Sequence, residues 1–232
     1  MPETELNRLL VGVDRPLRFA LARALEGGEI GAEDALLIAT ARGFALGVVA
    51  QVADELRRRQ AGDVVTYVVN RNINFTNVCI KHCTFCAFSR DHRAEQGYLL
   101  PIPEVVRRAR EAWDYGATEV CIQAGLPPKM DGWLYVDLCK AIKRALPDIH
   151  IHAFSPEEVL YGSVRAGVSI PSYLKALKEA GLDTLPGTSA EILVQEVRDR
   201  IAPGRITRDQ WIDVITSAHA LDIRTTSTIM YG

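Results

Sequence analysis

The stretch NVCIKHCTFCAF, residues 77–88, places three cysteines within eight positions, at Cys79, Cys83 and Cys86, and no fourth cysteine lies near them. A closed tetrahedral metal site takes four protein ligands, whereas a set of three leaves a position for another molecule. Thiolate sulfur is the ligand that iron–sulfur clusters select, and a cuboidal cluster normally takes four of them. The spacing Cys-x3-Cys-x2-Cys therefore predicts a cluster with one open iron, which can chelate a small molecule through an amine and a carboxylate.

A zinc site is the alternative interpretation of these cysteines, with His82 or His92 as the fourth ligand. Zinc accepts three cysteines and one histidine, but His82 lies inside the loop, between two ligands, and cannot easily reach back. The remaining Cys121 and Cys139 fall within a predicted strand and a predicted helix, where we expect small buried side chains. Five cysteines, three of them in one loop, indicate metal or redox chemistry and not a disulfide framework.

The composition is that of a globular protein with a sizeable core. The 232 residues are 48% hydrophobic and carry a net charge of −2, which favours neither a nucleic acid nor a membrane as the main partner. No early stretch has the features of a signal peptide, and no apolar run approaches the ~18 residues of a membrane span. We therefore expect a cytoplasmic protein with reduced thiols.

The hydrophobic pattern divides the chain into a helical segment, residues 1–62, and a segment of alternating strands and helices, residues 63–232. The first segment predicts three helices, which begin near residues 17, 33 and 44. Strands are predicted at residues 64–70, 118–125, 150–155, 183–187 and 224–232. Helices are predicted between them at residues 102–115, 133–146, 156–180 (as a pair), 190–201 and 207–221. Strands separated by helices of this length form βαβ crossovers, so the predicted fold class is α/β with a parallel sheet.

The carboxyl ends of the predicted strands mark the expected ligand-binding face, as in parallel barrels and part-barrels. The cysteine loop follows the first strand and falls on that face, with Gln123–Gly125, Phe154–Ser155 and Pro186–Thr188 at later strand ends. The chain stops directly after its last predicted strand, with no helix to cover it. We therefore expect an incomplete core domain, and we expect a chain extended through a sixth strand and its helix to be more soluble and more active.

The three cysteines, with the aromatic Phe85 directly before the last of them, resemble the signature of radical S-adenosylmethionine (SAM) enzymes. The resemblance implies a 4Fe–4S cluster whose open iron holds the methionine part of SAM, with Phe85 near the adenine. One electron from the cluster would cleave SAM into methionine and a 5′-deoxyadenosyl radical, which abstracts hydrogen from the substrate. The implied fold is a partial parallel (β/α)6 TIM-like barrel, in agreement with the five strands counted here.

Residues at other strand ends match further features of that family. The turn Gln123-Ala124-Gly125 resembles the glycine-containing turn that receives the amino group of SAM, and glycine there lets the backbone approach the ligand. The resemblance further implies that Glu191 contacts the ribose and that Arg198, seven residues on, pairs with the carboxylate of SAM. Ser155 is another cofactor-binding candidate. Surface positions are an equal alternative for Glu191 and Arg198.

Longer strings narrow the resemblance to one subgroup, which contains the two halves of deazaflavin (FO) synthase and two menaquinone-pathway enzymes that act on futalosine derivatives. The strings are NRNINFTNVC (70–79), FCAFSR (85–90), GYLL (97–100), DIHIHAFSPEEV (148–159), LPGTSAEIL (185–193) and TTSTIMYG (225–232). Residues 150–159 and 186–203 are most similar to the tyrosine-using half, the CofH type. One departure is QAG at residues 123–125, where QGG is more usual.

The CofH resemblance implies a 4-hydroxyphenyl transferase with L-tyrosine and 5-amino-6-(D-ribitylamino)uracil as substrates. The radical would take hydrogen from the tyrosine amino group, the Cα–Cβ bond would break, and the hydroxybenzyl fragment would add to C5 of the uracil. A second radical SAM subunit, of the CofG type, would then close the deazaflavin ring. An external one-electron reductant would supply the cluster.

His150 and His152 alternate along the third predicted strand, so we expect only one of them to face the barrel interior. We favour His152, nearer the ligand end, as a catalytic residue that contacts substrate or handles a proton, with a packed polar role as the alternative. Two other functions stay open from the sequence. One is a futalosine-pathway radical SAM synthase, and the other is a non-catalytic iron–sulfur or zinc-binding regulatory module.

Overall fold

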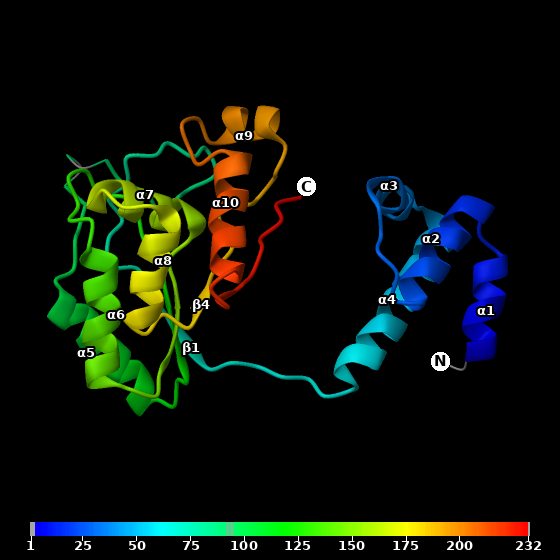
Figure 1. Ribbon diagram of the computed structural model, residues 1–232, viewed down its shortest axis with the longest axis horizontal. Coiled ribbons are helices and arrows are strands. Elements are labelled where there is room, and N and C mark those ends of the chain that lie inside the picture. The colour runs from blue at the N-terminus through cyan, green and yellow to red at the C-terminus, as the bar shows by residue number, and fades with distance from the viewer. Residues whose placement is uncertain (1–2, 92, 94, 232) are drawn as a thin grey trace. The chain divides into compact units, whose positions relative to one another are not determined.

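A computed structural model describes residues 3–91, 93 and 95–231 of the chain (Figure 1). The chain divides into two compact units, of which the first ends at Tyr67 and the second begins at Val68. Each unit has a hydrophobic core of its own. No helix in this described part of the chain is long and apolar enough to cross a membrane.

The first unit is helical (Figure 1, blue to cyan). Its described helices are α1 (Glu3–Val11), α2 (Arg15–Leu25), α3 (Ala32–Thr40) and α4 (Gly43–Ala61). Helix α2 has a proline in its first turn, where no N–H is needed, and it ends shortly before Gly27, whose φ of 78° a helix cannot continue. The apolar spacing predicted three of these helices, and α1 was not predicted.

The second unit contains a parallel sheet of five strands within the described residues, and the strands lie side by side in the order of the sequence. They are β1 (Asn70–Ile73), β2 (Glu119–Ile122), β3 (His150–Ala153), β4 (Thr184–Leu185) and β5 (Arg224–Thr225). The register aligns Asn72, Cys121, His152, Thr184 and Arg224 across the sheet. The predicted α/β class with a parallel sheet is therefore confirmed.

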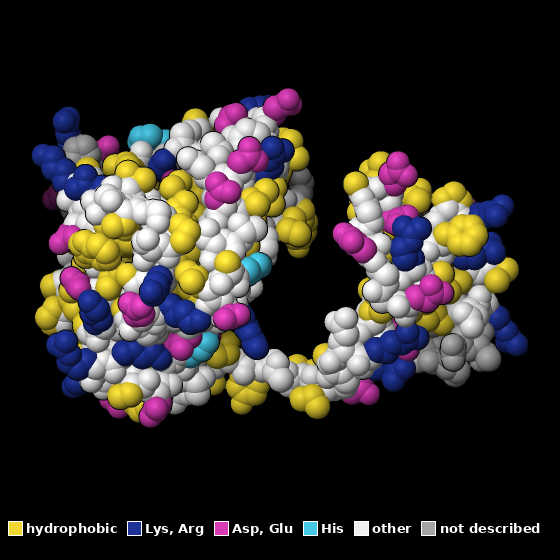
Figure 2. All heavy atoms as spheres, in the orientation of Figure 1, with side chains coloured by type: hydrophobic (Ala, Val, Ile, Leu, Met, Phe, Trp, Pro, Cys, Tyr) yellow, Lys and Arg dark blue, Asp and Glu magenta, His cyan; other side chains and the backbone are white. Residues whose placement is uncertain are grey.

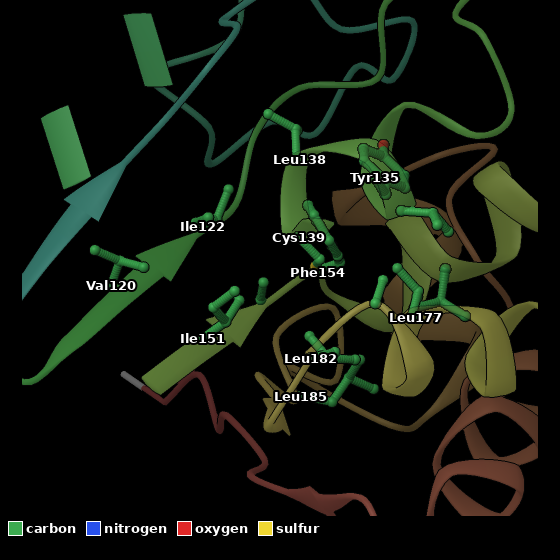
Figure 3. Close-up of a cluster of buried hydrophobic side chains, with 14 of the residues drawn as sticks. Val120, Ile122, Tyr135, Leu138, Cys139, Ile151, Phe154, Leu177, Leu182 and Leu185 are labelled. Atoms are coloured by element: carbon green, nitrogen blue, oxygen red, sulfur yellow. The ribbon is translucent and has the colours of Figure 1, made fainter. Parts of the chain in front are cut away.

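Helices cover one face of this sheet, and the core lies between the two layers (Figures 1 and 3). The helices are α5 (Ile102–Asp114), α6 (Leu134–Ala145), α7 (Pro156–Ala166), α8 (Ile170–Glu179), α9 (Gln195–Ile201) and α10 (Arg208–His219). Val120 and Ile151 point from the sheet into the same cluster as Leu138 and Cys139 of α6 and Leu177 of α8 (Figure 3). Cys139 is thus a small buried core residue, as predicted.

Three predicted elements differ from the structure. No strand forms at residues 64–69, because Val64, Val65 and Tyr67 are 77%, 90% and 86% exposed and have no layer to pack against. The helix predicted at residues 190–201 begins only at Gln195, since Glu191 has a φ of 36° that a helix cannot contain. The last predicted strand is paired only over Arg224–Thr225, and beyond it single backbone hydrogen bonds replace the ladder.

The face of the sheet away from the helices is polar. Successive side chains on a strand point to opposite faces, so the residues between the buried Val120, Ile122 and Ile151 share the other face. His150 and His152 are two positions apart and both lie on that face, where each ring contacts the hydroxyl of Thr184. The prediction that only one of them faces the interior is therefore wrong, because a period of two returns to the same side.

Candidate functional site

A cavity of about 210 Å³ lies beyond the carboxyl ends of β1, β2 and β3. Eight of the residues singled out from the sequence line it: Cys79, Cys83, Phe85, Cys86, Gln123, Ala124, Gly125 and Ser155. They come from three loops that are distant in sequence and are brought together because parallel strands end at one edge of the sheet. Glu191, Arg198 and His152 do not line this cavity.

The cysteine loop is held by backbone hydrogen bonds to its surroundings. The Cys79 N–H donates to the carbonyl of Arg90 at 3.1 Å, and the Ile80 N–H donates to the carbonyl of Leu126 at 3.0 Å. The Thr84 N–H donates to the carbonyl of Ile201, at the end of α9, at 2.8 Å. The thiols therefore sit on a loop fixed at several points and not on a free strand end.

The thiols of this loop differ in their surroundings. Cys79 and Cys83 are partly buried, and Cys86 is exposed toward the cavity. Burial raises the pKa of the Cys83 thiol, and the positive charge of Arg205 acts in the opposite direction. The Arg205 guanidinium therefore lies near these thiols, and its positive charge favours their thiolate form.

The donor set fits a cuboidal 4Fe–4S cluster better than a zinc ion. Zinc needs four ligands converging on one point at ~2.0–2.3 Å, and among the described residues no three His, Cys, Asp or Glu side chains form such a group. In a cuboidal cluster each thiolate binds a different iron, so three thiolates around one cavity need not converge. The other described thiols lie elsewhere, with Cys121 in β2 and Cys139 in the core. His92, one of the two alternative zinc ligands, lies outside the described residues.

The turn after β2 packs directly on the cysteine loop. The Gly125 N–H donates to the carbonyl of Thr76 at 3.0 Å, and a Cβ at this position would overlap the carbonyl of Val78. Glycine is therefore required at residue 125 by close approach. Ala124 does not adopt a positive φ, so the departure from the usual QGG is sterically harmless.

Glu158 of α7 joins two walls of the cavity. Its carboxylate accepts hydrogen bonds from the Ala124 N–H at 2.9 Å and from the Ser155 N–H and hydroxyl at 2.7 Å each. Burial raises the pKa of Glu158 to about 7, while these hydrogen bonds act to lower it. The sequence analysis missed this residue, although the Ser-x-x-Glu spacing of a helix capping box could have indicated it.

Arg205 is one of two cations that line the cavity, with Lys81 as the other, and it was also missed. Its guanidinium lies 5.6 Å from the centre of the Phe85 ring, donates to the Ser189 hydroxyl at 2.8 Å and pairs with Glu191 at 3.1 Å. Glu191 thus acts on the cavity through Arg205 and does not line it. Arg205 lies in a loop between α9 and α10 that has no motif, so no pattern in the sequence pointed to it.

Arg198 is 4% exposed and lies behind the cavity wall. Its guanidinium donates to the carbonyls of Ser189, Ala190, Ile192 and Ile206. These bonds tie the loop before α9 to the segment that enters α10. The position of Arg198 favours a role in holding that loop over contact with a cofactor carboxylate.

His152 lies deeper, on the polar face of the sheet. It borders a second cavity, of about 330 Å³, together with Glu119, His150, Thr184 and Arg224. Burial lowers the pKa of His152, which favours the neutral ring at neutral pH. The structure therefore separates this histidine from the cysteines and groups it with other polar residues of the strands.

Residues 73–232 match the sequence profile of the Radical SAM superfamily. The chain belongs to this superfamily. Radical SAM proteins use a 4Fe–4S cluster and SAM, so the cofactors predicted from the cysteine loop are confirmed. The cavity described above is where the three cysteines and the turn after β2 meet.

Two relatives are similar over most of the chain. FO synthase of Streptomyces avermitilis is 48% identical over 221 residues, which are 95% of this chain and 26% of that protein. The 5-amino-6-(D-ribitylamino)uracil–L-tyrosine 4-hydroxyphenyl transferase of Methanocaldococcus jannaschii is 51% identical over 183 residues, which are 78% of this chain and 51% of that protein. The chain thus spans about a quarter to a half of the length of these relatives.

Solved structures show the same fold at low sequence identity. HydG, a maturase of the [FeFe]-hydrogenase, superposes with a TM-score of 0.74 at 17% identity and covers 99% of this chain and 50% of its own. Methylornithine synthase (PylB) superposes with a TM-score of 0.65 at 18% identity and covers 90% of this chain and 58% of its own. The predicted fold, a radical SAM core preceded by helices, is confirmed.

Proposed function

We propose that this chain belongs to a radical SAM transferase that moves the 4-hydroxybenzyl group of L-tyrosine onto 5-amino-6-(D-ribitylamino)uracil, a step in deazaflavin (FO) biosynthesis. The observation that carries the proposal is the 51% identity to the transferase of that name over 183 residues, which include the cysteine loop and the turn after β2. A second radical SAM subunit of the CofG type, an external one-electron reductant and a cytoplasmic location are parts of the same proposal.

The residues around the first cavity divide the work of holding the cofactors. Cys79, Cys83 and Cys86 would hold the cluster, and the backbone at Gly125 would lie against the amino acid part of SAM. Bound together, the cluster and SAM supply a radical that abstracts hydrogen from a substrate. Phe85 offers an aromatic face at the cavity wall.

Arg205 and Glu158 have distinct supporting roles in this proposal. Arg205 is the cation best placed to bind a carboxylate in the cavity, because it lines the wall and its neighbours Glu191 and Phe85 fix its orientation. Glu158 keeps the turn after β2 and the start of α7 at a fixed separation through its three hydrogen bonds. A fixed cavity wall excludes water from a reactive intermediate.

The test is an anaerobic assay of the full-length enzyme reconstituted with iron, sulfide, SAM and a reductant. We expect 5′-deoxyadenosine to form only when L-tyrosine is present, and a uracil adduct to form when 5-amino-6-(D-ribitylamino)uracil is added. Phenylalanine should react with a kcat/KM roughly 10⁴-fold lower, since a site that hydrogen-bonds the phenol loses that partner. Turnover of a futalosine-type substrate in place of tyrosine would contradict the proposal.

A further inference from the structure

The polar face of the sheet forms a wall on which charged and hydroxyl side chains lie in register. One row crosses all five strands through Asn72, Cys121, His152, Thr184 and Arg224, and a second row carries Glu119 beside His150. The interior of a parallel barrel is ordinarily filled by layers of branched apolar side chains. Polar groups at such positions cost free energy unless they are hydrogen-bonded, so the wall suits a polar occupant, either water or a polar part of a substrate.

Four side chains of the wall are linked in one chain of contacts. The Nε2 atom of His150 is 3.8 Å from a Glu119 carboxylate oxygen and 2.8 Å from the Thr184 hydroxyl. The same hydroxyl is 2.8 Å from Nδ1 of His152. At 3.8 Å the Glu119 carboxylate is too far for a hydrogen bond, but its negative charge favours the tautomer of His150 with the proton on Nε2, which donates to the Thr184 hydroxyl. The Thr184 hydroxyl then donates to His152, whose outer Nε2–H is left to donate to a ligand.

The wall presents both donors and acceptors to the cavity beside it. The Arg224 side chain makes no hydrogen bond or ion pair with any residue that the structure describes, and its guanidinium donates only. Nε2 of His152 is a second donor, and the Glu119 carboxylate is an acceptor. The cavity of about 330 Å³ has a lining of Glu, His, Thr and Arg side chains, without a Phe, Tyr, Trp or large aliphatic one. Such a lining suits a polyhydroxylated chain, in which every hydroxyl both donates and accepts, better than a phenol ring or a base.

The wall is also connected to the first cavity by Gln123. Its side chain donates to the Cys121 sulfur at 3.3 Å and accepts from the Thr188 hydroxyl at 2.8 Å, and Gln123 lines the cavity of the three cysteines. Glu119 is four residues earlier on the same strand and face, which is ~13 Å at ~3.3 Å per residue. One elongated substrate can therefore have its reacting end at the cysteine cavity and a polar tail against the wall.

We propose that Glu119, His150, His152, Thr184 and Arg224 bind the ribityl chain of the uracil substrate, and this inference rests on the proposed function. Four of the five carbons of that chain carry a hydroxyl group, which matches the mixture of donors and acceptors on the wall. Thr184 is the central residue of the wall, because its hydroxyl contacts a ring nitrogen of each histidine and so fixes the orientation of both rings.

The test compares kcat/KM of the full-length enzyme for 5-amino-6-(D-ribitylamino)uracil and for 5,6-diaminouracil, which lacks the ribityl chain. Wild-type enzyme should prefer the ribityl substrate. Thr184→Val keeps the shape of the side chain and removes its hydroxyl, and it should reduce this preference by roughly 10-fold to 100-fold, the usual effect of lost buried hydrogen bonds. The KM for tyrosine should not change. Thr216→Val on α10 is the matched control, since that hydroxyl bonds only carbonyls of its own helix.

Arg224→Gln supplies a second variant in case Thr184→Val fails to fold, because Arg224 is exposed and its replacement leaves no cavity. It should raise the KM for the ribityl substrate and leave that for 5,6-diaminouracil unchanged. Folded variants that keep the full wild-type preference would overturn the inference. A wild-type enzyme that makes no adduct with either uracil would instead refute the proposed function, and this inference with it.

Discussion

At the scale of single residues, the cysteines separate into two kinds. Cys79, Cys83 and Cys86 border one cavity, whereas Cys121 lies within β2 and Cys139 within the core. Each of the first three, replaced by alanine, should abolish cluster retention, because two thiolates do not hold a cuboidal cluster. Anaerobically reconstituted wild-type enzyme should contain about four irons and four sulfides per chain.

Cys121→Ala is the control for this prediction and should retain the wild-type content of iron and sulfide. The measurement is chemical analysis of both elements together with the visible absorption spectrum. Stoichiometric zinc without sulfide in the wild-type protein would contradict the assignment of the loop.

The raised pKa of Glu158 predicts that the stability of the folded protein depends on pH. Its pKa is about 7 in the folded protein and 4.5 ordinarily, so between these values only the folded state holds the proton. The free energy of unfolding should therefore fall as pH rises from about 4.5 to about 7, by up to about 3 kcal/mol, and level off above that. Glu158→Gln, which does not titrate, should lack this decrease.

Urea unfolding of the apoprotein at several pH values between 5 and 8 measures this effect as the difference between wild type and Glu158→Gln. Glu104→Gln on the surface of α5 is the matched control and should keep the wild-type slope, because arginine hydrogen bonds hold the pKa of Glu104 at about 2. An identical pH dependence in wild type and Glu158→Gln would show that burial does not perturb this carboxyl.

At the scale of elements, the site depends on how closely two loops approach each other. The loop after β1 and the turn after β2 are joined by the Ile80 and Gly125 backbone hydrogen bonds, and a side chain at residue 125 would overlap Val78. Gly125→Ala should therefore push the loops apart, at a typical overpacking cost of ~1–3 kcal/mol. We expect a lower Tm and a lower cluster content.

Gly47→Ala in α4 is the matched control, because a Cβ there has nothing within 4 Å. It should leave cluster content unchanged and, through helix propensity, stabilise its helix by up to ~1 kcal/mol. Thermal unfolding and iron analysis of the two variants give the comparison. A Gly125→Ala variant that matches wild type in both would show that the loops can separate freely.

At the scale of the whole molecule, charge is spread and the two units are joined by an apolar linker. On the face shown in Figure 2, basic and acidic side chains are interspersed, and hydrophobic side chains stand out along the connecting segment. Tyr67 in this segment is 86% exposed and Tyr115 is 84% exposed, but only Tyr115 has its backbone N–H bonded to a helix end. Limited chymotrypsin digestion should therefore cut after Tyr67 well before Tyr115.

Mass spectrometry of the early fragments identifies the first cut. Tyr67→Ser should slow the appearance of the two fragments without changing the Tm of the second unit. Initial cleavage within residues 68–231 would contradict the assignment of the linker as the accessible segment.

The sequence by itself determined the features that depend on local spacing. The Cys-x3-Cys-x2-Cys loop and the alternation of strands with helices are local patterns, so the fold class could be predicted and the three cysteines could be proposed as metal ligands. The apolar run at residues 64–69 predicted a strand that does not form, since strand composition does not reveal whether a partner strand is present.

Only the tertiary structure decided which polar residues meet. Arg205 reaches the cavity and Arg198 does not, because backbone carbonyls of one loop take up the guanidinium of Arg198 and the next loop carries Arg205 to the wall. His150 and His152 are linked through Thr184 of a neighbouring strand, because both rings contact its hydroxyl. Thr184 is more than thirty positions away from either histidine in the sequence. Such contacts arise from strand register and loop closure, which bring distant residues together, and one-dimensional spacing contains no record of them.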